Sequence, residues 1–363
     1  MDTIISPRKR LTKIILSRLS IFILIIASLA SWLNYSDFFG ESRDYSSYEI
    51  FFEHVLSQSC DNTQAFRFEV GFQYLSCLIA YIAPSSKGIY ATSILISLIP
   101  KLFVVAMISA ASPFKFLRIP ISFILALLIY MTRFFPLHEL TQLRISIGIS
   151  FMLIAFLYMQ NETIRANIKG KNSKKQSSII LNWKRFAVPL LAIFTAILFH
   201  SSLLALVPFI FLQDFANSRR FILISSFILF VVLFFSSSLI NNFAVGNFSA
   251  GIFYIGGSGE DVNLFSSQKI LDWLLLMMGL ILVDPKNRMS LSCLCIFAYS
   301  FSMFYGFSAF PVFAHRLSEA FQVFSVLFVA SMGNKNQVVF VLPIAIAFSI
   351  LNVWIFTTRD LFF

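Results

Sequence analysis

The sequence predicts an all-α fold, a polytopic membrane bundle of about 11–12 membrane helices in a single integral domain, residues 1–363. Hydrophobic residues occupy 58% of the 363 positions and charged residues only 12%, a balance outside the range of soluble globular domains. Apolar runs at 21–32, 221–240 and 338–356 approach the roughly 20 residues that a spanning helix needs. Alternating strand patterns of a membrane barrel are absent, so the backbone polar groups must be satisfied within helices.

Lysine and arginine cluster in six places, at 8–18, 115–118, 165–185, 219–220, 286–288 and 335. Because loops that stay in the cytoplasm are enriched in these residues, we assign all six clusters and the N-terminus to the cytoplasmic side of a bacterial inner membrane. The first cluster precedes an apolar run that continues into the bundle, which favours an uncleaved anchor over a cleaved signal peptide. The net charge of +11 is thereby explained by topology, and no nucleic-acid partner is expected.

Neighbouring cytoplasmic clusters must be joined by an even number of crossings. This rule predicts spans near 19–35, 89–111, 119–135, 144–160, 221–240, 271–284, 289–307, 317–333 and 338–356, with the C-terminus outside. It also predicts outer loops at 36–69, 136–144, 241–269 and 308–316, and a solvated basic cytoplasmic loop at 161–186. The four cysteines show no metal or disulfide spacing, so we interpret them as small apolar packing residues.

Two intervals need something other than plain spans. The apolar piece near 68–83 has only about 14 suitable residues, or roughly 21 Å of helix, against a hydrocarbon core of about 30 Å. We expect it to be a re-entrant or interfacial helix on the outer side. The second interval is an apolar stretch interrupted at its midpoint by His200, which is either a tight helical hairpin that reverses there or one tilted helix with a histidine at mid-membrane.

With this topology the remaining polar residues gather on the outer face. The first outer loop contains Asp44, Tyr45, Tyr48 and, at its end, Glu69. Tyrosine rings combine an apolar face with a hydroxyl and are common platforms for sugars, although an interfacial aromatic belt has the same composition.

The second outer turn contains Glu139 and Gln142, with Arg144 opening the next helix, and Arg316 precedes a late span. Two arginines suit a diphosphate because each presents a planar fork to phosphate oxygens. His200 suits proton transfer. Lys101, in the middle of a span, either snorkels, pairs with an acid or enters a cavity.

Several chemistries lack their motifs. The sequence has no aspartate pair at metal spacing, no GxGxxG, no P-loop, no GxSxG and no HExxH. We therefore expect neither a metal nor another cofactor, and no nucleotide hydrolysis.

Five motifs in order resemble the EpsG family of Wzy-type polysaccharide polymerases. They are Asp44-Tyr45-Ser46-Ser47-Tyr48, Glu69-Val70-Gly71-Phe72, Gln142-Leu143-Arg144, Phe199-His200-Ser201-Ser202-Leu203 and Arg316. Their order and spacing agree over about 280 residues, although Ser42-Arg43 stands where the family usually has a Gly-Thr pair.

The resemblance implies a metal-independent glycosyltransferase of the outer face, for O-antigen, capsule or exopolysaccharide. It would transfer a glycan from an undecaprenyl-diphosphate donor to a second lipid-linked repeat unit, with a chain-length regulator and a flippase as pathway partners. We expect Arg144 and Arg316 to hold the diphosphate, with Gln142 and Glu139 beside them. His200, Asp44 or Glu69 would take the acceptor proton, and Tyr45 and Tyr48 would orient sugar rings.

Three other functions stay open at this stage. A lipid-linked oligosaccharide flippase or other transporter would show internal repeats and polar groups at mid-membrane. A membrane O-acyltransferase of surface glycans would also use a buried histidine. A ligase that moves finished chains onto a lipid core would share the polymerase's chemistry.

Overall fold

A computed structural model describes residues 43–57, 60, 66, 68–110, 112, 115–116, 119–172, 183–247 and 264–358. Outside these ranges lie the predicted first span, 19–35, and most of the predicted outer loop 241–269. The described chain is helical apart from a two-residue antiparallel pair, β1 (Lys115–Phe116) with β2 (Ile119–Pro120). The predicted all-α class is confirmed.

Among the described residues, six helices are long and apolar enough to cross a bilayer. These are α4 (Ser86–Ser109), α5 (Ile121–Ile129) with its π-helical continuation η3 (Tyr130–Glu139), α6 (Leu143–Asn172), α9 (Arg219–Asn247), α12 (Arg288–Gly306) and α15 (Lys335–Thr358). Shorter helices complete the bundle: α7 (Trp183–Phe199), α11 (Ser267–Leu282), α13 (Pro311–Gln322) and α14 (Phe324–Ala330). Their positions match the predicted spans, so the chain is a multi-pass membrane protein.

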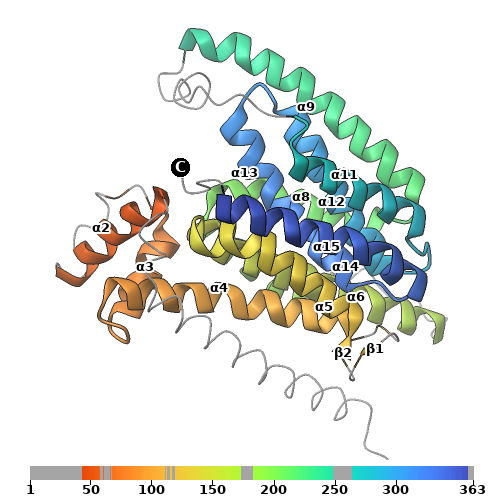
Figure 1. The fold of residues 1–363 in the computed structure, drawn as a ribbon, viewed down its shortest axis with the longest axis horizontal. Helices are drawn as coiled ribbons and strands as arrows, with labels where there is room; N and C mark the ends of the chain where they lie inside the picture. Colours follow the sequence, from red (N-terminus) through yellow and green to blue (C-terminus); the bar gives the residue numbers. More distant parts are fainter. Residues whose placement is uncertain are drawn as a thin grey trace, which may run out of the picture.

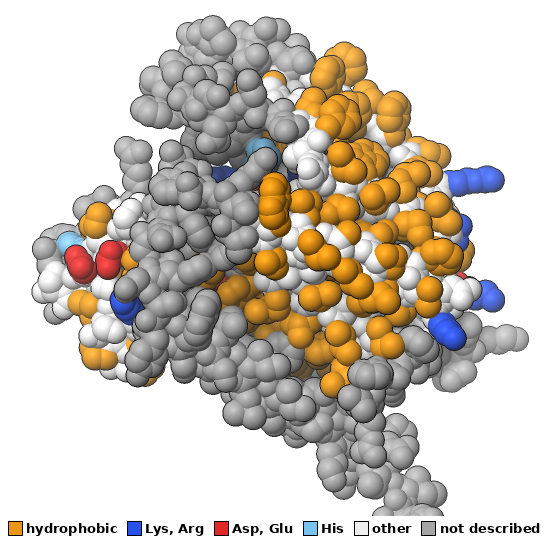
Figure 2. Space-filling model, in the orientation of Figure 1, with side chains coloured by type: hydrophobic (Ala, Val, Ile, Leu, Met, Phe, Trp, Pro, Cys, Tyr) orange, Lys and Arg blue, Asp and Glu red, His pale blue; other side chains and the backbone are white. Residues whose placement is uncertain are grey.

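The helices run side by side, with α2 (Arg43–Ser57) and α3 (Val70–Ala80) at one end of the bundle (Figure 1). Hydrophobic side chains cover the middle of the surface in the same view, and Lys and Arg project at the opposite edge (Figure 2). Contacts bring three of the basic clusters together there, because Arg219 donates to the Val283 carbonyl and Asn287 donates to the Ser331 carbonyl. A belt of apolar surface with cations at one end is the pattern expected of a protein seated in a bilayer.

The first predicted outer loop, 36–69, contains a helix. Tyr45, Tyr48, Phe52 and Val55 of α2 are all buried, and their spacing of three or four residues places them on one helical face. That face packs on α3 and α4 through rings such as Tyr48 and Phe72, whose centroids lie 5.5 Å apart. The segment is therefore a packed helix and not an extended loop, because its apolar residues recur at helical spacing.

The predicted short helix is confirmed as α3, which has 11 residues and so spans only about 16 Å. Tyr74 and Tyr81 are 74% and 83% exposed, whereas Phe72, Ser76 and Ile79 are buried. A helix of this length is too short to cross a hydrocarbon core of about 30 Å, and its apolar exposed face is the pattern expected of an interfacial helix.

A disulfide joins Cys60 to Cys77 of α3, with the two Cα atoms 5.9 Å apart. The prediction that all four cysteines are packing residues is wrong for this pair and holds for Cys293 and Cys295, which are buried free thiols. The two cysteines stand 17 positions apart in the sequence, a spacing that matches no motif, and only the packing of α2 against α3 brings them within bonding reach.

The hairpin interpretation of the His200 interval is confirmed. Helix α7 ends at Phe199, His200 is extended, with φ −160° and ψ 110°, and the chain continues as η4 (Ser201–Leu206) and α8 (Val207–Leu212). The return arm reaches the far end of the apolar part of α6, Leu143–Gln160, where Gln160 donates a 3.0 Å hydrogen bond to Gln213. His200 therefore lies at the tip of the hairpin, close to the first turn of α6.

Helix α3 contacts α7 closely just before the hairpin tip, at Gly71 and Leu198. A Cβ placed on Gly71 would lie 2.8 Å from the Leu198 carbonyl oxygen and 3.0 Å from the Leu198 Cβ. We expect Gly71→Ala to push α3 from α7 and lower the free energy of unfolding by about 1–3 kcal/mol, as overpacking does. Thermal unfolding of the purified protein measures this; Gly333→Ala is the control, since nothing lies within 4 Å of its added Cβ. Equal melting of the two variants would contradict the prediction.

Candidate functional site

A small polar pocket at the end of the bundle that carries α2 and α3 collects most of the predicted site residues. It is lined by Tyr48, Gln142, Arg144, Ile145, His200 and Arg316. Helix α2 supplies Tyr48, the start of α6 supplies Arg144, the hairpin tip supplies His200 and α13 supplies Arg316. Four separate segments thus converge on one place.

Glu69 joins two of these segments. Its Oε2 accepts a 2.5 Å hydrogen bond from Arg144 Nη1, and its Oε1 lies 2.7 Å from His200 Nδ1. The Arg144 guanidinium also lies over the Phe68 ring, 4.8 Å from its centroid. One carboxylate therefore holds both a cation and a histidine, with side-chain exposures of 23% for Arg144 and 14% for His200.

The charge state of Glu69 follows from these contacts. Burial raises the pKa of the Glu69 carboxyl, but the His200 hydrogen bond and the positive charge of Arg144 outweigh it, so the pKa lies below its ordinary value of 4.5. An ionised carboxylate only accepts hydrogen bonds. We therefore assign the His200 proton to Nδ1, which leaves the Nε2 lone pair for another partner.

This shift predicts a pH-dependent contribution to stability. Because the folded-state pKa of Glu69 is lowered, its stabilising contribution is fully present above pH 4.5 and is lost as the pH falls through the folded-state value. We expect Glu69→Gln to melt below the wild type at neutral pH and the gap to close in the acid range below 4.5. Melting curves of both proteins from pH 7 to pH 3 measure this, and a gap that widens toward acid would contradict it.

The other side of the pocket carries Arg316 and Gln142. Arg316 is exposed, and Gln142 Nε2 donates a 3.2 Å hydrogen bond to Glu319 Oε2 on the same helix as Arg316. Two guanidinium groups thus border one pocket from different helices. The Gln142–Glu319 hydrogen bond joins α13, which carries Arg316, to the turn before α6, which carries Arg144.

The chain matches the EpsG family over residues 19–169 and 176–363. The chain belongs to the EpsG family. Family membership makes it a membrane protein implicated in exopolysaccharide biosynthesis. No curated protein and no solved structure matches it. All the residues that line the pocket of this EpsG family member, and Glu69, fall within the matched ranges.

Three predicted site residues of this EpsG family member lie at the start of α2, and of these Tyr48 alone lines the pocket. Tyr45 is 5% exposed, its ring packs edge-on against Tyr90 at 5.2 Å, and it does not line the pocket. Tyr48 lines the pocket, but its ring stacks on Phe68 at 5.5 Å and its side chain hydrogen-bonds with Arg144, so the ring presents no open face to a sugar. Asp44 is the second residue of α2, and its side chain lies outside the described part of the chain.

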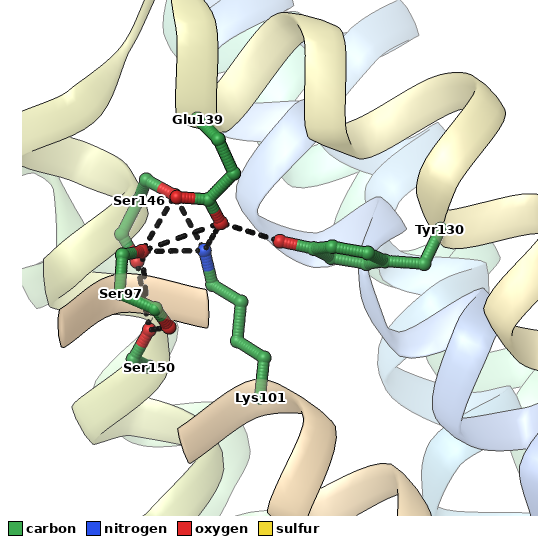
Figure 3. A network of polar contacts seen from close by, with 6 residues as sticks. All are labelled: Ser97, Lys101, Tyr130, Glu139, Ser146 and Ser150. Carbon is green, nitrogen blue, oxygen red and sulfur yellow. Dashed lines mark hydrogen bonds and ion pairs between the residues drawn. The ribbon is translucent and has the colours of Figure 1, made fainter. Parts of the chain in front are cut away.

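Glu139 is also placed elsewhere, because the predicted outer turn 136–144 is shorter than expected. The π-helix η3 continues to Glu139, and this side chain is fully buried and points to Lys101 (Figure 3). Glu139 Oε1 accepts from Lys101 Nζ at 2.6 Å and from the Tyr130 hydroxyl at 2.5 Å. Glu139 does not line the pocket, and of the options for Lys101 the structure selects pairing with an acid.

The Lys101–Glu139 pair ties three helices together. Lys101 and Ser97 come from α4, Glu139 from η3, and Ser146 from α6 (Figure 3). Lys101 Nζ donates to Ser97 Oγ at 2.9 Å and to Ser146 Oγ. Such a pair is costly to break because removal of one partner leaves a charge buried alone.

We expect Lys101→Met to lose about 3–5 kcal/mol of stability, the usual cost of an orphaned buried charge. The double variant Lys101→Met/Glu139→Gln is expected to recover most of it. Size-exclusion profiles and melting of the detergent-solubilised protein measure both. Lys335→Met, at an exposed position, is the control, and a double variant less stable than the single one would contradict the prediction.

A second group of charges, which was not among the predicted site residues, lies beside the pocket. Arg133 of η3 donates to Asp272 of α11 from both terminal nitrogens, Nη1 and Nη2, and the Nη2–Oδ2 distance is 2.6 Å. Its Nη2 also donates to Gln322 Oε1 at 2.7 Å. Lys269 of α11 is buried nearby with Glu319. The available signal was the presence of charged residues inside or at the start of predicted spans, which marks functional positions by default.

No group of three or more His, Cys, Asp or Glu side chains within the described ranges has the arrangement of a metal site. The pocket's chemistry is instead that of two guanidinium groups, a carboxylate and an imidazole. Such a set can bind an anion and move a proton.

Proposed function

We propose that this protein is a polysaccharide repeat-unit polymerase. It transfers a glycan from an undecaprenyl-diphosphate donor to a hydroxyl of a second lipid-linked repeat unit. The observation that carries the proposal is the convergence of Arg144, His200 and Arg316 on one pocket, with Glu69 bridging the first two. Membership of the EpsG family, which is implicated in exopolysaccharide biosynthesis, supports the same chemistry.

Arg144 and Arg316 hold oxygens of the donor diphosphate. As the glycosidic C–O bond breaks, the bonding electrons pass to the diphosphate oxygen, and fixed cations stabilise the negative charge that develops there. Guanidinium forks match phosphate oxygens in bidentate fashion. The Glu69 and Phe68 contacts of Arg144 hold its fork in one orientation before substrate arrives.

His200 is the general base. Its Nδ1–H is donated to Glu69, so Nε2 takes the proton from the acceptor hydroxyl while the oxygen forms the new bond to the sugar. The proton later passes from His200 to the departing diphosphate or to water. Glu69 orients the imidazole and stabilises its charged form, and Tyr48 and Gln142 border the space where the sugars lie.

We place the pocket on the outer face of the bacterial inner membrane, with the N-terminus in the cytoplasm. Two observations support this orientation. The basic clusters around Arg219, Asn287 and Lys335 meet at the end opposite the pocket, as the positive-inside tendency requires. The Cys60–Cys77 disulfide lies in the region of α3, near the pocket, and disulfides persist in oxidising compartments.

The test is the surface-glycan profile of a strain that lacks the gene. The proposal predicts surface glycan of one repeat unit without a ladder, and a ladder restored by the wild-type gene. A full ladder that lacks an ester group would overturn the proposal in favour of an O-acyltransferase. Lipid-linked repeats that stall on the cytoplasmic side would overturn it in favour of a flippase.

A further inference from the structure

An apolar groove runs along the bundle between α9 and α11, with α12 as its floor. It encloses about 580 Å³. Phe227 and Phe230 of α9 form one wall, Trp273 and Met277 of α11 the other, and Phe301 lies on the floor. The groove is long enough for an extended chain, because its lining positions on α9 run from Ile222 to Phe234, about 18 Å of helix.

Specific hydrogen bonds hold the wall formed by α9 against the floor. Ser302 Oγ of α12 donates to the Ser226 carbonyl at 2.7 Å, and Ser237 Oγ of α9 donates to the Gly306 carbonyl at 2.9 Å. Gly306 permits this approach, since a Cβ there would lie 2.6 Å from the Leu233 Cβ. The groove is therefore a built feature of the helix packing and not a gap left by a loosely attached helix.

One end of the groove adjoins the cationic side of the candidate site. Tyr305 lines the groove, and the adjacent Phe304 ring is contacted by Lys269 Nζ, 3.9 Å from the ring centroid, and by the His315 ring at 5.1 Å. Arg316, the next residue, lines the polar pocket. An apolar channel thus leads to a group of basic side chains.

Lys269 is the part of this end that the proposed mechanism does not use. It is 6% exposed, and among the described residues it forms no salt bridge and donates no side-chain hydrogen bond. Asp272, the acid one turn along its helix, is bonded to Arg133. Glu319, the other acid near Lys269, accepts a hydrogen bond from Gln142. A buried ammonium that contacts an aromatic ring, and whose two neighbouring carboxylates are bonded to other side chains, favours an anionic ligand.

We propose that the groove binds the polyprenyl tail of a lipid-diphosphate substrate, whose diphosphate lies at the end formed by Lys269 and Arg316. This inference rests on the proposed function, and it places the lipid tail of the donor in the groove. A single long isoprenoid chain with an anionic head matches a single apolar channel that ends at cations, and the channel delivers the head to the pocket where the glycosidic bond breaks. An ordinary anionic phospholipid is the competing occupant.

The experiment uses the full chain in nanodiscs of phosphatidylethanolamine and phosphatidylglycerol, with added undecaprenyl diphosphate. The photoreactive residue p-benzoylphenylalanine replaces either Met277, which lines the groove, or Leu274, which is exposed on the same helix outside it. Mass spectrometry then identifies the lipid attached at each position. We expect polyprenyl adducts at 277 and phospholipid adducts at 274, and about tenfold weaker polyprenyl labelling at 277 in Lys269→Met. If position 277 labels phospholipid and no polyprenyl lipid, or if both positions label polyprenyl lipid equally, the groove does not bind the polyprenyl tail.

A kinetic experiment separates this proposal from the polymerase itself. Met277→Trp narrows the groove about 12 Å along α11 from Lys269, so it should raise KM for a donor on an undecaprenyl tail. KM for the same donor on a dimethylallyl tail, which has a single isoprene unit and is too short to reach position 277, should stay unchanged. Leu274→Trp is the matched control. If the wild type forms polymer but Met277→Trp changes KM equally for both tails or for neither, the groove proposal alone is overturned. Polyprenyl labelling at 277 in a protein that forms no polymer overturns the polymerase alone.

Discussion

Arg144→Ala is expected to abolish glycan polymerisation, with a fall in rate of about 10²–10³, the usual cost of removing one donor that stabilises charge in the transition state. The loss is chemical because Arg144 opens α6 at the pocket rather than in the core of the bundle. Arg144→Lys keeps the charge but loses the planar fork, so it should retain only part of the activity. The measurement is the surface-glycan ladder of a deletion strain that expresses each variant, together with its membrane level.

Arg316→Ala tests the second half of the diphosphate clamp. Because Arg316 is exposed, its loss should leave folding intact and still remove the ladder. Arg220→Ala is the control, since Arg220 is an exposed arginine at the opposite end of the bundle. Wild-type ladders from both Arg144→Ala and Arg316→Ala would refute the clamp.

His200→Ala is expected to lower the polymerisation rate by about 10²–10⁴, the range that a positioned general base contributes. Glu69→Gln should also lower it, because an amide neither fixes the Nδ1–H tautomer nor neutralises Arg144. If Glu69 acts through His200, the double variant Glu69→Gln/His200→Ala should lose little more than His200→Ala alone. The measurement is single-turnover transfer with purified protein and lipid-linked repeats.

The matched control for the histidine is His54→Ala, in α2, whose ring contacts Phe66 and not the pocket. It should transfer glycan at the wild-type rate. A pH–rate profile adds a readout that a structural role would not change. The pH dependence of the rate should differ in shape between the wild type and His200→Ala, because the variant lacks the proposed base. Wild-type rates in His200→Ala would assign the base elsewhere.

The organisation of the chain into membrane helices was predictable from local sequence. Apolar runs of about 20 residues and clusters of basic residues set the spans and their order, because a bilayer leaves the backbone few alternatives to a helix. The short α3 followed from its length, whereas the polar interruption at His200 left a reversal and a single tilted helix as two interpretations. The helix in 43–57 was also readable from the period of its aromatic residues, although we predicted that segment as a loop.

Part of the candidate site was predictable by the same logic. Glu69, Arg144, His200 and Arg316 stood out because charged or titratable residues at membrane boundaries are few in this chain. Their convergence was an expectation that local sequence could not test, since Glu69 lies 75 residues from Arg144 and 131 from His200.

The sequence by itself determined which segments are long and apolar enough to enter the bilayer, and it marked the residues that we propose carry the chemistry. Tertiary structure alone decided their partners. Glu139 stands three residues from Gln142, yet the continuation of η3 turns it inward to Lys101. Cys60 meets Cys77 only because α2 packs against α3. The physical reason is that a buried charge or thiol pairs with whatever the facing helix presents, and helix faces are set by packing across the whole bundle.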